Sequence, residues 1–429
     1  MSQLARSREP FAVRRGGDDD GGVIHASDTD PIDAPRHREP PPGALRPVRG
    51  GRGRRDLYDR RLAARHERWP VTGRVLGAVM ARPELLLAAT GNRAPVERGG
   101  RVLNRGVQAL LALVDLTDRT TDRNGGEPDP VDVRGMFDAT ARLVMPVRTD
   151  VHVTGRRIPG PDGAPDIAVR VYRRFGTGIG PGPRPPAITY FHGGGWVVGN
   201  LDSHDASCRL LAAVTGSVVV AVDYRLAPEH PFPAAVEDCL AAYSWVHGAH
   251  RELGTADGVV GVMGDSAGGN LAAVVALAGR DGTVPAPVAQ GLVYPALDAR
   301  LDSPSVTAFA EGFLLSKASM EAYRAHYLPD RHDWESWRAS PLLAEDKRGV
   351  APALVVTAGF DPLRDEGAAY ARDLEAAGVE VGYRCYDDMV HGFFGMGVVP
   401  DCLALAVEVC DAMGALMRRG ARRAAEGDG

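Results

Sequence analysis

Long apolar runs are missing from this sequence of 429 residues. Its longest purely apolar stretches, such as Leu271 to Ala278, span eight residues, whereas a helix needs about twenty apolar residues to cross a membrane. The first residues also lack the apolar segment that a secretory signal peptide requires. We therefore expect a cytoplasmic protein that does not span a membrane.

Cysteine is scarce, and charge of neither sign dominates. The five cysteines are scattered through the chain without a C-x-x-C pair, which is typical of reduced core residues rather than of a disulfide framework or a metal site. A formal net charge of −5 provides no general attraction for nucleic acid or anionic lipid. We expect no metal, no cofactor and no nucleic-acid partner. A peripheral membrane contact is compatible with the sequence but not favoured, and the oligomeric state is left open.

Residues 1–60 are an arm that is poor in large apolar side chains and rich in arginine, glycine and proline. Too little apolar surface is available there to offset the chain entropy lost on folding, so the arm is predicted to be disordered. Residues 36–68 carry eleven arginines and four acidic residues. That excess is compatible with contact to nucleic acid, an anionic membrane or a protein partner, but a solvated tail is the favoured interpretation.

Residues 61–147 are predicted to be helical. Apolar residues recur at helical spacing within 75–80 and 110–114, and Asp129 followed by Pro130 is typical of an N-cap and a first helical position. No set of catalytic side chains stands out in this region. We expect these helices to cover part of the molecule or to lie on a lipid surface.

From residue 148 to residue 429, short apolar or β-branched runs alternate with helical segments. The predicted strands are 167–174, which alternates like an edge strand, 187–191, 218–222, 259–263, 289–294, 354–358 and 379–386. The predicted helices include 233–247, 267–279 and 364–377. This repetition favours a parallel sheet with helices on both faces. Residues 300–348 are a long, aromatic-rich insertion without a strand, which is more typical of a functional segment than of a random loop.

The strongest local signal is the G-x-S-x-G motif of residues 264–268, with Ser266 at its centre. It follows an apolar strand and precedes an apolar helical run, the context that a nucleophile on a sharp strand-to-helix turn requires. Glycines on both sides make room for a strained serine backbone, and the N-terminus of the next helix favours negative charge. The flanking pattern favours Ser266 as a nucleophile over a chance glycine-rich turn.

A serine nucleophile needs a base with a pKa near neutrality, which is most often a histidine. Of twelve histidines, His391 follows the last predicted strand, at the sheet edge where open α/β sheets place reactive groups. Asp361 follows the preceding predicted strand and is the favoured carboxylate to orient the imidazole. The competing acids are Asp365, Glu366, Asp387 and Asp388.

The segment His192-Gly193-Gly194-Gly195-Trp196 follows another predicted strand. Consecutive glycines allow a close approach of the backbone and can turn N–H groups toward an anion. We predict that the N–H groups of Gly193, Gly194 and Ala267 form an oxyanion hole. A phosphate-binding loop is disfavoured, because the G-x-G-x-x-G pattern and the Walker lysine are both missing.

Five motifs together, HGGG, VDYRLAPEHPFPAAVEDC, GDSAGGNLAA, DPLRDE and VHGF, resemble the hormone-sensitive-lipase-like branch of the α/β-hydrolases, which includes bacterial carboxylesterases. The resemblance covers about residues 148–418 and leaves the arm unexplained. It implies a mostly parallel, eight-stranded twisted sheet with helices on both faces, and a helical cap from residues 61–147 and 300–348. It also implies Ser266 as nucleophile, Asp361 as orienting acid and His391 as base, with the same oxyanion hole.

The function implied is that of a serine carboxylic-ester hydrolase acting on small esters with short- to medium-chain acyl groups. The expected apolar lining of its substrate site consists of Trp196, Phe313, Trp334, Trp337 and Phe393. A non-catalytic ligand receptor of the same fold is an alternative, which the presence of His391 disfavours. A further alternative is hydrolysis of amides, lactones or carbamates, because these reactions pass through intermediates similar to those of ester hydrolysis.

Overall fold

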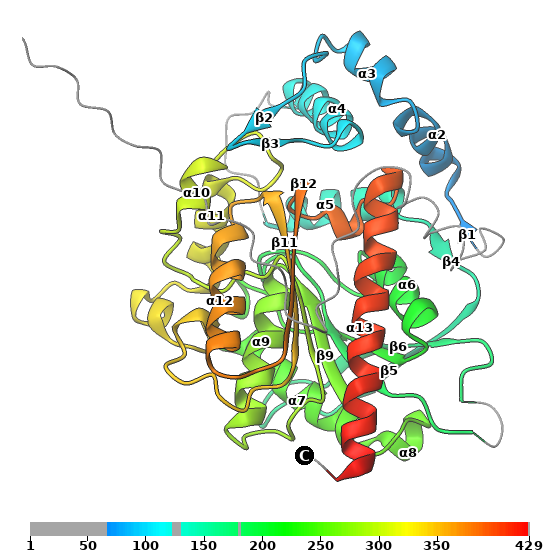
Figure 1. Cartoon of the computed structure of the whole chain (residues 1–429), viewed down its shortest axis with the longest axis vertical. Helices are drawn as coiled ribbons and strands as arrows, with labels where there is room; N and C mark the ends of the chain where they lie inside the picture. Colours follow the sequence, from blue (N-terminus) through cyan, green and yellow to red (C-terminus); the bar gives the residue numbers. More distant parts are fainter. Residues whose placement is uncertain (1–66, 122–129, 179–181, 428–429) are drawn as a thin grey trace, which may run out of the picture. The chain divides into compact units, whose positions relative to one another are not determined.

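The computed structural model describes residues 67–121, 130–178 and 182–427. The arm predicted for residues 1–60 and the N-cap predicted at Asp129 lie outside these ranges. A sheet of eight strands forms the centre of the described part (Figure 1), in the order β12-β11-β10-β9-β7-β8-β6-β5.

Most of this sheet is parallel. Its strands are β5 (Val151–Ile158), β6 (Ile167–Arg174), β7 (Ala187–Phe191), β8 (Val218–Asp223), β9 (Val260–Asp265), β10 (Gln290–Val293), β11 (Ala353–Phe360) and β12 (Val381–Val390). The six strands from β12 to β8 in the sheet order pair in parallel, whereas β6 pairs antiparallel with both β8 and β5. The predicted α/β-hydrolase fold with a mostly parallel, eight-stranded sheet is confirmed.

The edge of the sheet differs from the prediction. Strand β5 was not predicted, and it lies outside β6, so β6 is not an edge strand. Only the two terminal residues of β5, Val151 and Ile158, are buried. Because its middle residues face solvent or are half-buried, the strand lacks the alternation of apolar and polar residues by which a strand is recognised.

Helices cover both faces of the sheet. Helices α6 (Asp205–Thr215) and α13 (Pro400–Glu426) lie on one face, and α7 (Ala234–Gly248), α9 (Ala267–Arg280) and α12 (Arg364–Ala376) lie on the other. On β8, Val219 packs into the hydrophobic core beneath α6 and α13, whereas Val218 and Val220 pack into the core beneath α7, α9 and α12. Because both faces of the sheet are buried, its central strands form nearly continuous apolar runs. Such runs can be recognised in the sequence, so these strands could be predicted.

The two segments expected to form a cap are largely helical. The first contains α2 (Val71–Met80), α3 (Pro83–Ala89), α4 (Arg105–Thr121) and α5 (Pro130–Val144), with short strands β1 (Glu67–Arg68), β2 (Glu97–Arg98), β3 (Arg101–Val102) and β4 (Val147–Arg148). The second contains α10 (Pro304–Ala308), α11 (Lys317–Tyr327) and the 3-10 turns η2 (Arg331–Glu335) and η3 (Pro341–Leu343). Figure 1 shows α2, α3 and α4 beyond the carboxyl ends of β11 and β12. None of the helices described is long and apolar enough to cross a membrane.

Candidate active site

Ser266 lies at the sharp turn between β9 and α9. Its backbone has φ 55° and ψ −120°, a conformation that residues other than glycine rarely adopt. The turn is tightly packed: a Cβ on Gly268 would stand 2.0 Å from the Phe191 carbonyl oxygen, and one on Gly264 would stand 2.2 Å from the Gly268 carbonyl oxygen. The glycines of the motif are therefore required by packing.

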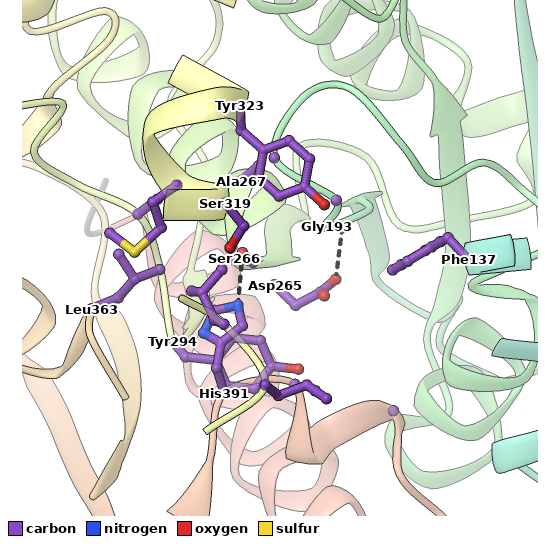
Figure 2. Close-up of a pocket in the computed structure, with 18 of the residues that line it drawn as sticks. Phe137, Gly193, Asp265, Ser266, Ala267, Tyr294, Ser319, Tyr323, Leu363 and His391 are labelled. Carbon is purple, nitrogen blue, oxygen red and sulfur yellow. Dashed lines mark hydrogen bonds between the residues drawn. The ribbon is translucent and has the colours of Figure 1, made fainter. Parts of the chain in front are cut away.

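Ser266, His391 and Asp361 meet at the carboxyl edge of the sheet, although they follow three different strands. The Ser266 Oγ lies 2.9 Å from Nε2 of His391 (Figure 2), and Nδ1 of His391 lies 2.9 Å from Oδ2 of Asp361. Asp361 is fully buried, and its other oxygen accepts the Leu363 N–H at 2.8 Å. The imidazole packs against the Tyr294 ring, with centroids 4.6 Å apart. The imidazole is thus held with one nitrogen toward a carboxylate and the other toward a hydroxyl.

The competing acids make other contacts. Asp365 and Asp387 form ion pairs with arginines, and Glu366 accepts a backbone N–H. Burial raises the pKa of the Glu366 carboxyl well above its usual value. Among the acids in the described part of the chain, Asp361 is the one whose carboxylate is hydrogen-bonded to His391.

The glycine loop after β7 lies beside Ser266 (Figure 2). The Gly193 N–H donates to Oδ1 of Asp265 at 3.1 Å, so this group is directed at a carboxylate. The contact contradicts the predicted role of Gly193 as an oxyanion donor. Sequence alone could not reveal it, because neighbouring glycines of one loop look equivalent until their N–H directions are known.

Three other N–H groups near Ser266 are available. Within the residues described, no acceptor is recorded for the N–H of Gly194, Gly195 or Ala267, and all three residues line the same cavity. Gly195 has φ 59°, and a Cβ on it would stand 2.5 Å from the Tyr323 ring. Only glycine allows the backbone to pass between the serine and this ring.

Asp265, which the sequence analysis did not single out, fixes the glycine loop. Besides Gly193, its carboxylate accepts the Tyr190 hydroxyl at 2.6 Å and lies 3.5 Å from Nε2 of His204. Burial acts to raise the pKa of the Asp265 carboxyl, but the contacts with His204 and Tyr190 outweigh it and hold that pKa below its usual value. A buried, charged carboxylate therefore anchors the loop directly before the serine.

His192 has no contact with Ser266 and is held inside the loop. Its Nδ1 lies 2.8 Å from the Gly193 carbonyl oxygen, and the Tyr224 hydroxyl donates to the His192 carbonyl at 2.7 Å. Burial, with His204 nearby, lowers the pKa of His192 to about 3. A histidine that stays neutral at physiological pH and packs within the loop is suited to support, not to proton transfer.

A mostly apolar cavity of about 610 Å³ contains Ser266 and His391 in its wall (Figure 2). Trp196 lines it, as predicted. Phe313 and Phe393 do not, and their prediction as lining residues was wrong. The Phe313 ring packs 5.2 Å from that of Phe360, and the Phe393 ring packs edge-on to Tyr386, so both rings fill the protein core instead. Trp334 and Trp337 also lie outside the lining and pack against the core beneath α7 and α9.

Much of the lining comes from helices of the two segments expected to form a cap, but the sequence analysis did not name the residues involved. One face of α5 contributes Val133, Met136, Phe137, Thr140, Ala141 and Val144. Opposite, α11 contributes Met320 and Tyr323. The spacing of the α5 residues is that of one helix face, and the resemblance implied a cap from this region, but neither identified which of its side chains line the cavity.

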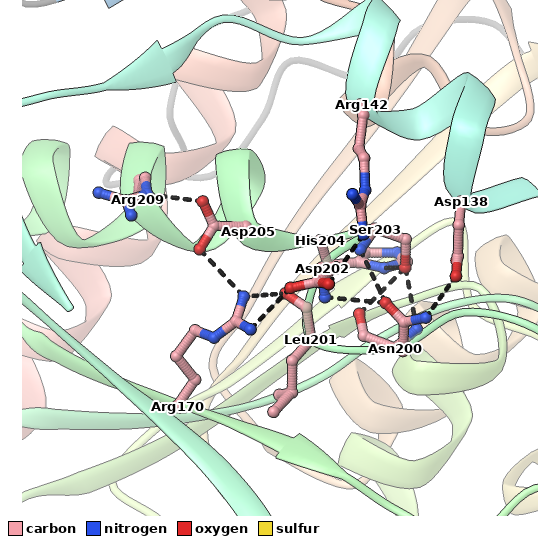
Figure 3. A network of polar contacts seen from close by, with 10 residues as sticks. All are labelled: Asp138, Arg142, Arg170, Asn200, Leu201, Asp202, Ser203, His204, Asp205 and Arg209. Atoms are coloured by element: carbon pink, nitrogen blue, oxygen red, sulfur yellow. Dashed lines mark hydrogen bonds and ion pairs between the residues drawn. The ribbon is translucent and has the colours of Figure 1, made fainter. Parts of the chain in front are cut away.

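A neighbouring face of α5 is fixed to the catalytic domain by polar contacts. The pairs are Arg134 with Glu229, Asp138 with Asn200 and Arg142 with Asp202, at 2.7, 2.6 and 2.8 Å, and Figure 3 shows the last two. The three α5 residues are four positions apart and so lie on one side of the helix. Because Asn200 and Asp202 follow the glycine loop directly, this wall of the cavity and the loop are held together.

Within the described ranges, no group of three or more histidine, cysteine, aspartate or glutamate side chains is arranged to bind a metal ion.

Comparison with known proteins agrees with this architecture. Residues 188–395 match the family model described as the alpha/beta hydrolase fold. The carboxylic ester hydrolase LipN of Mycobacterium tuberculosis is 41% identical over 357 residues, which cover 79% of this chain and 92% of that protein. An ethyl acetate hydrolase of Pseudomonas putida is 42% identical over 216 residues, 50% of this chain and 67% of that protein.

Solved structures show the same similarity. A thermostable esterase from Pseudomonas putida has a TM-score of 0.67 at 33% identity, over 73% of this chain and 98% of that one. An ester hydrolase from the metagenome of Lake Arreo, in complex with a derivative of bipyridine phosphonate, has a TM-score of 0.66 at 39% identity. The match covers 75% of this chain and 99% of that one. The chain therefore belongs to the hormone-sensitive-lipase-like branch of the α/β-hydrolase family, together with bacterial carboxylesterases.

Proposed function

We propose that this protein hydrolyses carboxylic esters through an acyl-enzyme formed on Ser266. The observation that carries the proposal is the hydrogen-bonded series from Ser266 through His391 to the buried Asp361, with both contacts at 2.9 Å, in the wall of an apolar cavity. Relatives named as carboxylic ester hydrolases support the reaction class.

In the first half of the reaction, the Ser266 Oγ attacks the ester carbonyl carbon while Nε2 of His391 takes the hydroxyl proton. Asp361 accepts the Nδ1–H and stabilises the imidazolium that forms. His391 then returns the proton to the alcohol oxygen, and the alcohol leaves. In the second half, water attacks the acyl carbon while His391 takes its proton. The bond to the Ser266 Oγ then breaks, His391 returns the proton to that oxygen, and the acid leaves.

The negative oxygen of each tetrahedral intermediate needs donors that already point at it. The N–H groups of Gly194, Gly195 and Ala267 are the candidates, with Gly195 replacing Gly193 from the earlier expectation. One such donor contributes about 3 kcal/mol to transition-state stabilisation. The buried Asp265 holds Gly193 and thereby sets the direction of the next two N–H groups.

The cavity supports esters with a short- to medium-chain acyl group. Its volume of about 610 Å³ and its apolar walls suit an aliphatic chain of limited length between α5 and α11. We propose an esterase rather than a lipase of long-chain triglycerides on this ground.

The test is a series of p-nitrophenyl esters from acetate to palmitate, assayed with the wild-type protein and with Ser266→Ala. We expect the highest kcat/KM for short and medium chains, and a loss of at least about 10⁴-fold in Ser266→Ala. The matched control is Ser244→Ala, because Ser244 lies on α7 and bonds to the Leu240 carbonyl, away from the cavity. Retained activity in Ser266→Ala would exclude the proposed nucleophile.

The same assay separates the alternatives. A ligand receptor would bind the esters and cleave none, although His391 and its two contacts are in place. An amidase would also turn over a p-nitroanilide with the same acyl chain, whereas an esterase would cleave the p-nitrophenyl ester and leave the anilide intact.

A further inference from the structure

Exposed apolar side chains are concentrated on the N-terminal helices. Of the eleven large hydrophobic residues that are exposed in the described part of the chain, eight lie between residues 71 and 143. They are Val71, Val75, Val79, Leu85, Val102, Leu116, Met136 and Leu143. Val71, Val75 and Leu85 are 76%, 62% and 66% exposed. Apolar side chains that gather on one surface region, unlike scattered ones, usually mark an interaction site.

Helix α2 is apolar on its outer as well as its inner side. Gly73 and Met80 are buried on the inner side, where a Cβ on Gly73 would stand 2.9 Å from the Leu143 carbonyl oxygen of α5. Val71, Val75 and Val79 follow each other at four-residue spacing on the outer side and are exposed. A helix with apolar side chains on two opposite sides normally buries both of them. Within residues 67–121, 130–178 and 182–427, the outer valines of α2 therefore have no cover of the kind that apolar side chains favour.

Positive charge surrounds this face. Arg68, Arg74 and Arg82 are exposed, and no ion pair is recorded for them within the residues described. Helix α2 contains no acidic residue, and Glu84 on α3 is paired with Arg105. Residues 67–105 hold seven arginines and three glutamates, in a chain whose formal net charge is −5. The segment is thus a basic region on an otherwise acidic protein.

We propose that α2 and α3 dock on an anionic lipid bilayer. The docking face consists of Val71, Val75, Val79 and Leu85, with Arg74 and Arg82 beside them. The apolar side chains enter the boundary between head groups and acyl chains, and the arginines contact lipid phosphates.

The charges favour this occupant over others. A second copy of the chain would bring arginine against arginine, and residues 36–68 of the chain itself also carry excess arginine. A nucleic acid would neutralise the arginines but leave the valines in water. Unlike these two occupants, an anionic bilayer satisfies both the apolar side chains and the positive charges. Since α2 and α3 pack on α4 and α5 (Figure 1), docking brings the wall of the substrate cavity next to the membrane.

Sedimentation with vesicles tests the proposal without any need for turnover. The full chain is mixed with vesicles of phosphatidylcholine alone, or of phosphatidylcholine with phosphatidylglycerol, at low and at high salt. We expect binding to the anionic vesicles that is at least tenfold tighter than to the neutral ones and that weakens at high salt. Failure of the full chain to bind anionic vesicles overturns the proposal, whatever its esterase activity.

Variants assign the binding to this face. Val75→Asn and Phe175→Asn remove side chains that are both 62% exposed, but Phe175 lies in a turn after β6, outside the docking face. We expect a severalfold loss of vesicle affinity in Val75→Asn, a larger loss in Val75→Asn with Arg74→Glu and Arg82→Glu, and none in Phe175→Asn. Hydrolysis of a soluble ester stays unchanged in all three, which shows that they fold. Unchanged vesicle binding in the triple variant (Val75→Asn, Arg74→Glu and Arg82→Glu) would show that another part of the chain binds the vesicles. Dimerisation that the triple variant abolishes, without vesicle binding, would assign the face to a second copy, and either result overturns the proposal.

Discussion

At the scale of single residues, the site depends on a serine in an unfavourable backbone conformation. A φ of 55° at Ser266 costs on the order of 1–3 kcal/mol relative to an ordinary conformation. The cost is offset by the close packing of Gly264 and Gly268, which fixes the turn from both sides. The hydroxyl is consequently held toward His391 before any substrate arrives, as catalysis by positioning requires.

Asp361→Asn tests how the imidazole is oriented. The amide has the size of the carboxylate but no negative charge, and its NH₂ can stabilise the wrong tautomer of His391. We expect kcat for p-nitrophenyl butyrate to fall by about 10⁴-fold with little change in KM. Asp387→Asn is the control, because Asp387 is exposed and paired with Arg101, and it should change kcat less than twofold. A fall of less than tenfold in Asp361→Asn would contradict the proposed role.

Asp265→Ala tests the anchoring of the glycine loop. Without the carboxylate, Gly193 and Tyr190 lose their common acceptor, and the neighbouring N–H groups lose their fixed direction. We expect kcat to fall about 100-fold, the effect of a displacement of about 1 Å, with a smaller change in KM. Asp265→Asn keeps an acceptor oxygen and should recover a part of the loss. Equal activity of the alanine and wild-type proteins would show that the loop needs no such anchor.

The residues of the candidate site were predictable to different degrees. Ser266, Asp361 and His391 each follow a strand, and the ends of parallel strands converge at one sheet edge, so chain position was enough to select them. Phe313 and Phe393 were selected as aromatic residues expected to line the substrate site under the predicted cap. Sequence does not specify whether such a ring faces a cavity or the core, and here both rings fill the core.

At the scale of secondary-structure elements, helix α5 has two roles on adjoining faces. One face lines the cavity and the other is attached to the segment after the glycine loop. The helical periodicity of α5 was visible in the sequence, but its partners lie sixty or more residues away in the catalytic domain. Such long-range contacts are set by the fold and not by the local pattern, and for the same reason β5 escaped prediction at the sheet edge.

Phe137→Ala tests the cavity-lining face of α5. Removal of the ring enlarges the cavity that Ser266 also lines, and each additional methylene that fits an apolar pocket changes discrimination by about tenfold or more. We expect the ratio of kcat/KM for the decanoate to that for the butyrate to rise at least about tenfold. Phe175→Ala, at an exposed ring outside the cavity, is the control and should leave the ratio unchanged. An unchanged ratio in Phe137→Ala would place the acyl chain elsewhere.

Glu229→Gln tests the contact between α5 and the catalytic domain. The measured quantity is the pH dependence of the unfolding free energy that the Arg134–Glu229 pair contributes. The hydrogen bond from Arg134 lowers the pKa of Glu229 from 4.5 to about 2. A lowered pKa in the folded state means that the carboxylate stabilises the fold above about pH 4.5 and that this contribution is lost as the pH falls toward 2. Because Glu229 is half exposed, solvent screening limits the contribution to less than about 1 kcal/mol.

Urea unfolding at a series of pH values measures this contribution. The wild-type protein should exceed Glu229→Gln in unfolding free energy by a constant amount between pH 5 and 7, and the difference should shrink below pH 4.5. A difference that grows as the pH falls would have the wrong sign for this ion pair.

At the scale of the whole molecule, a sheet buried on both faces by helices brings distant residues together. The order of strands and helices in residues 148–429 was largely predictable, because buried parallel strands have continuous apolar sequences. The cavity was not predictable, because it forms where helices from the beginning and the middle of the chain meet above the sheet. The fold brings Ser266, His391 and Asp361 into hydrogen-bond contact, and the proposed mechanism depends on this arrangement.

The most direct test of this account is to treat the full-length protein with an organophosphate and to locate the adduct by mass spectrometry. We predict a single stoichiometric adduct on Ser266, formed in proportion to the loss of esterase activity, and no adduct on the Ser266→Ala protein. Inactivation with the adduct on another residue, or equal labelling of Ser266→Ala, would contradict the account.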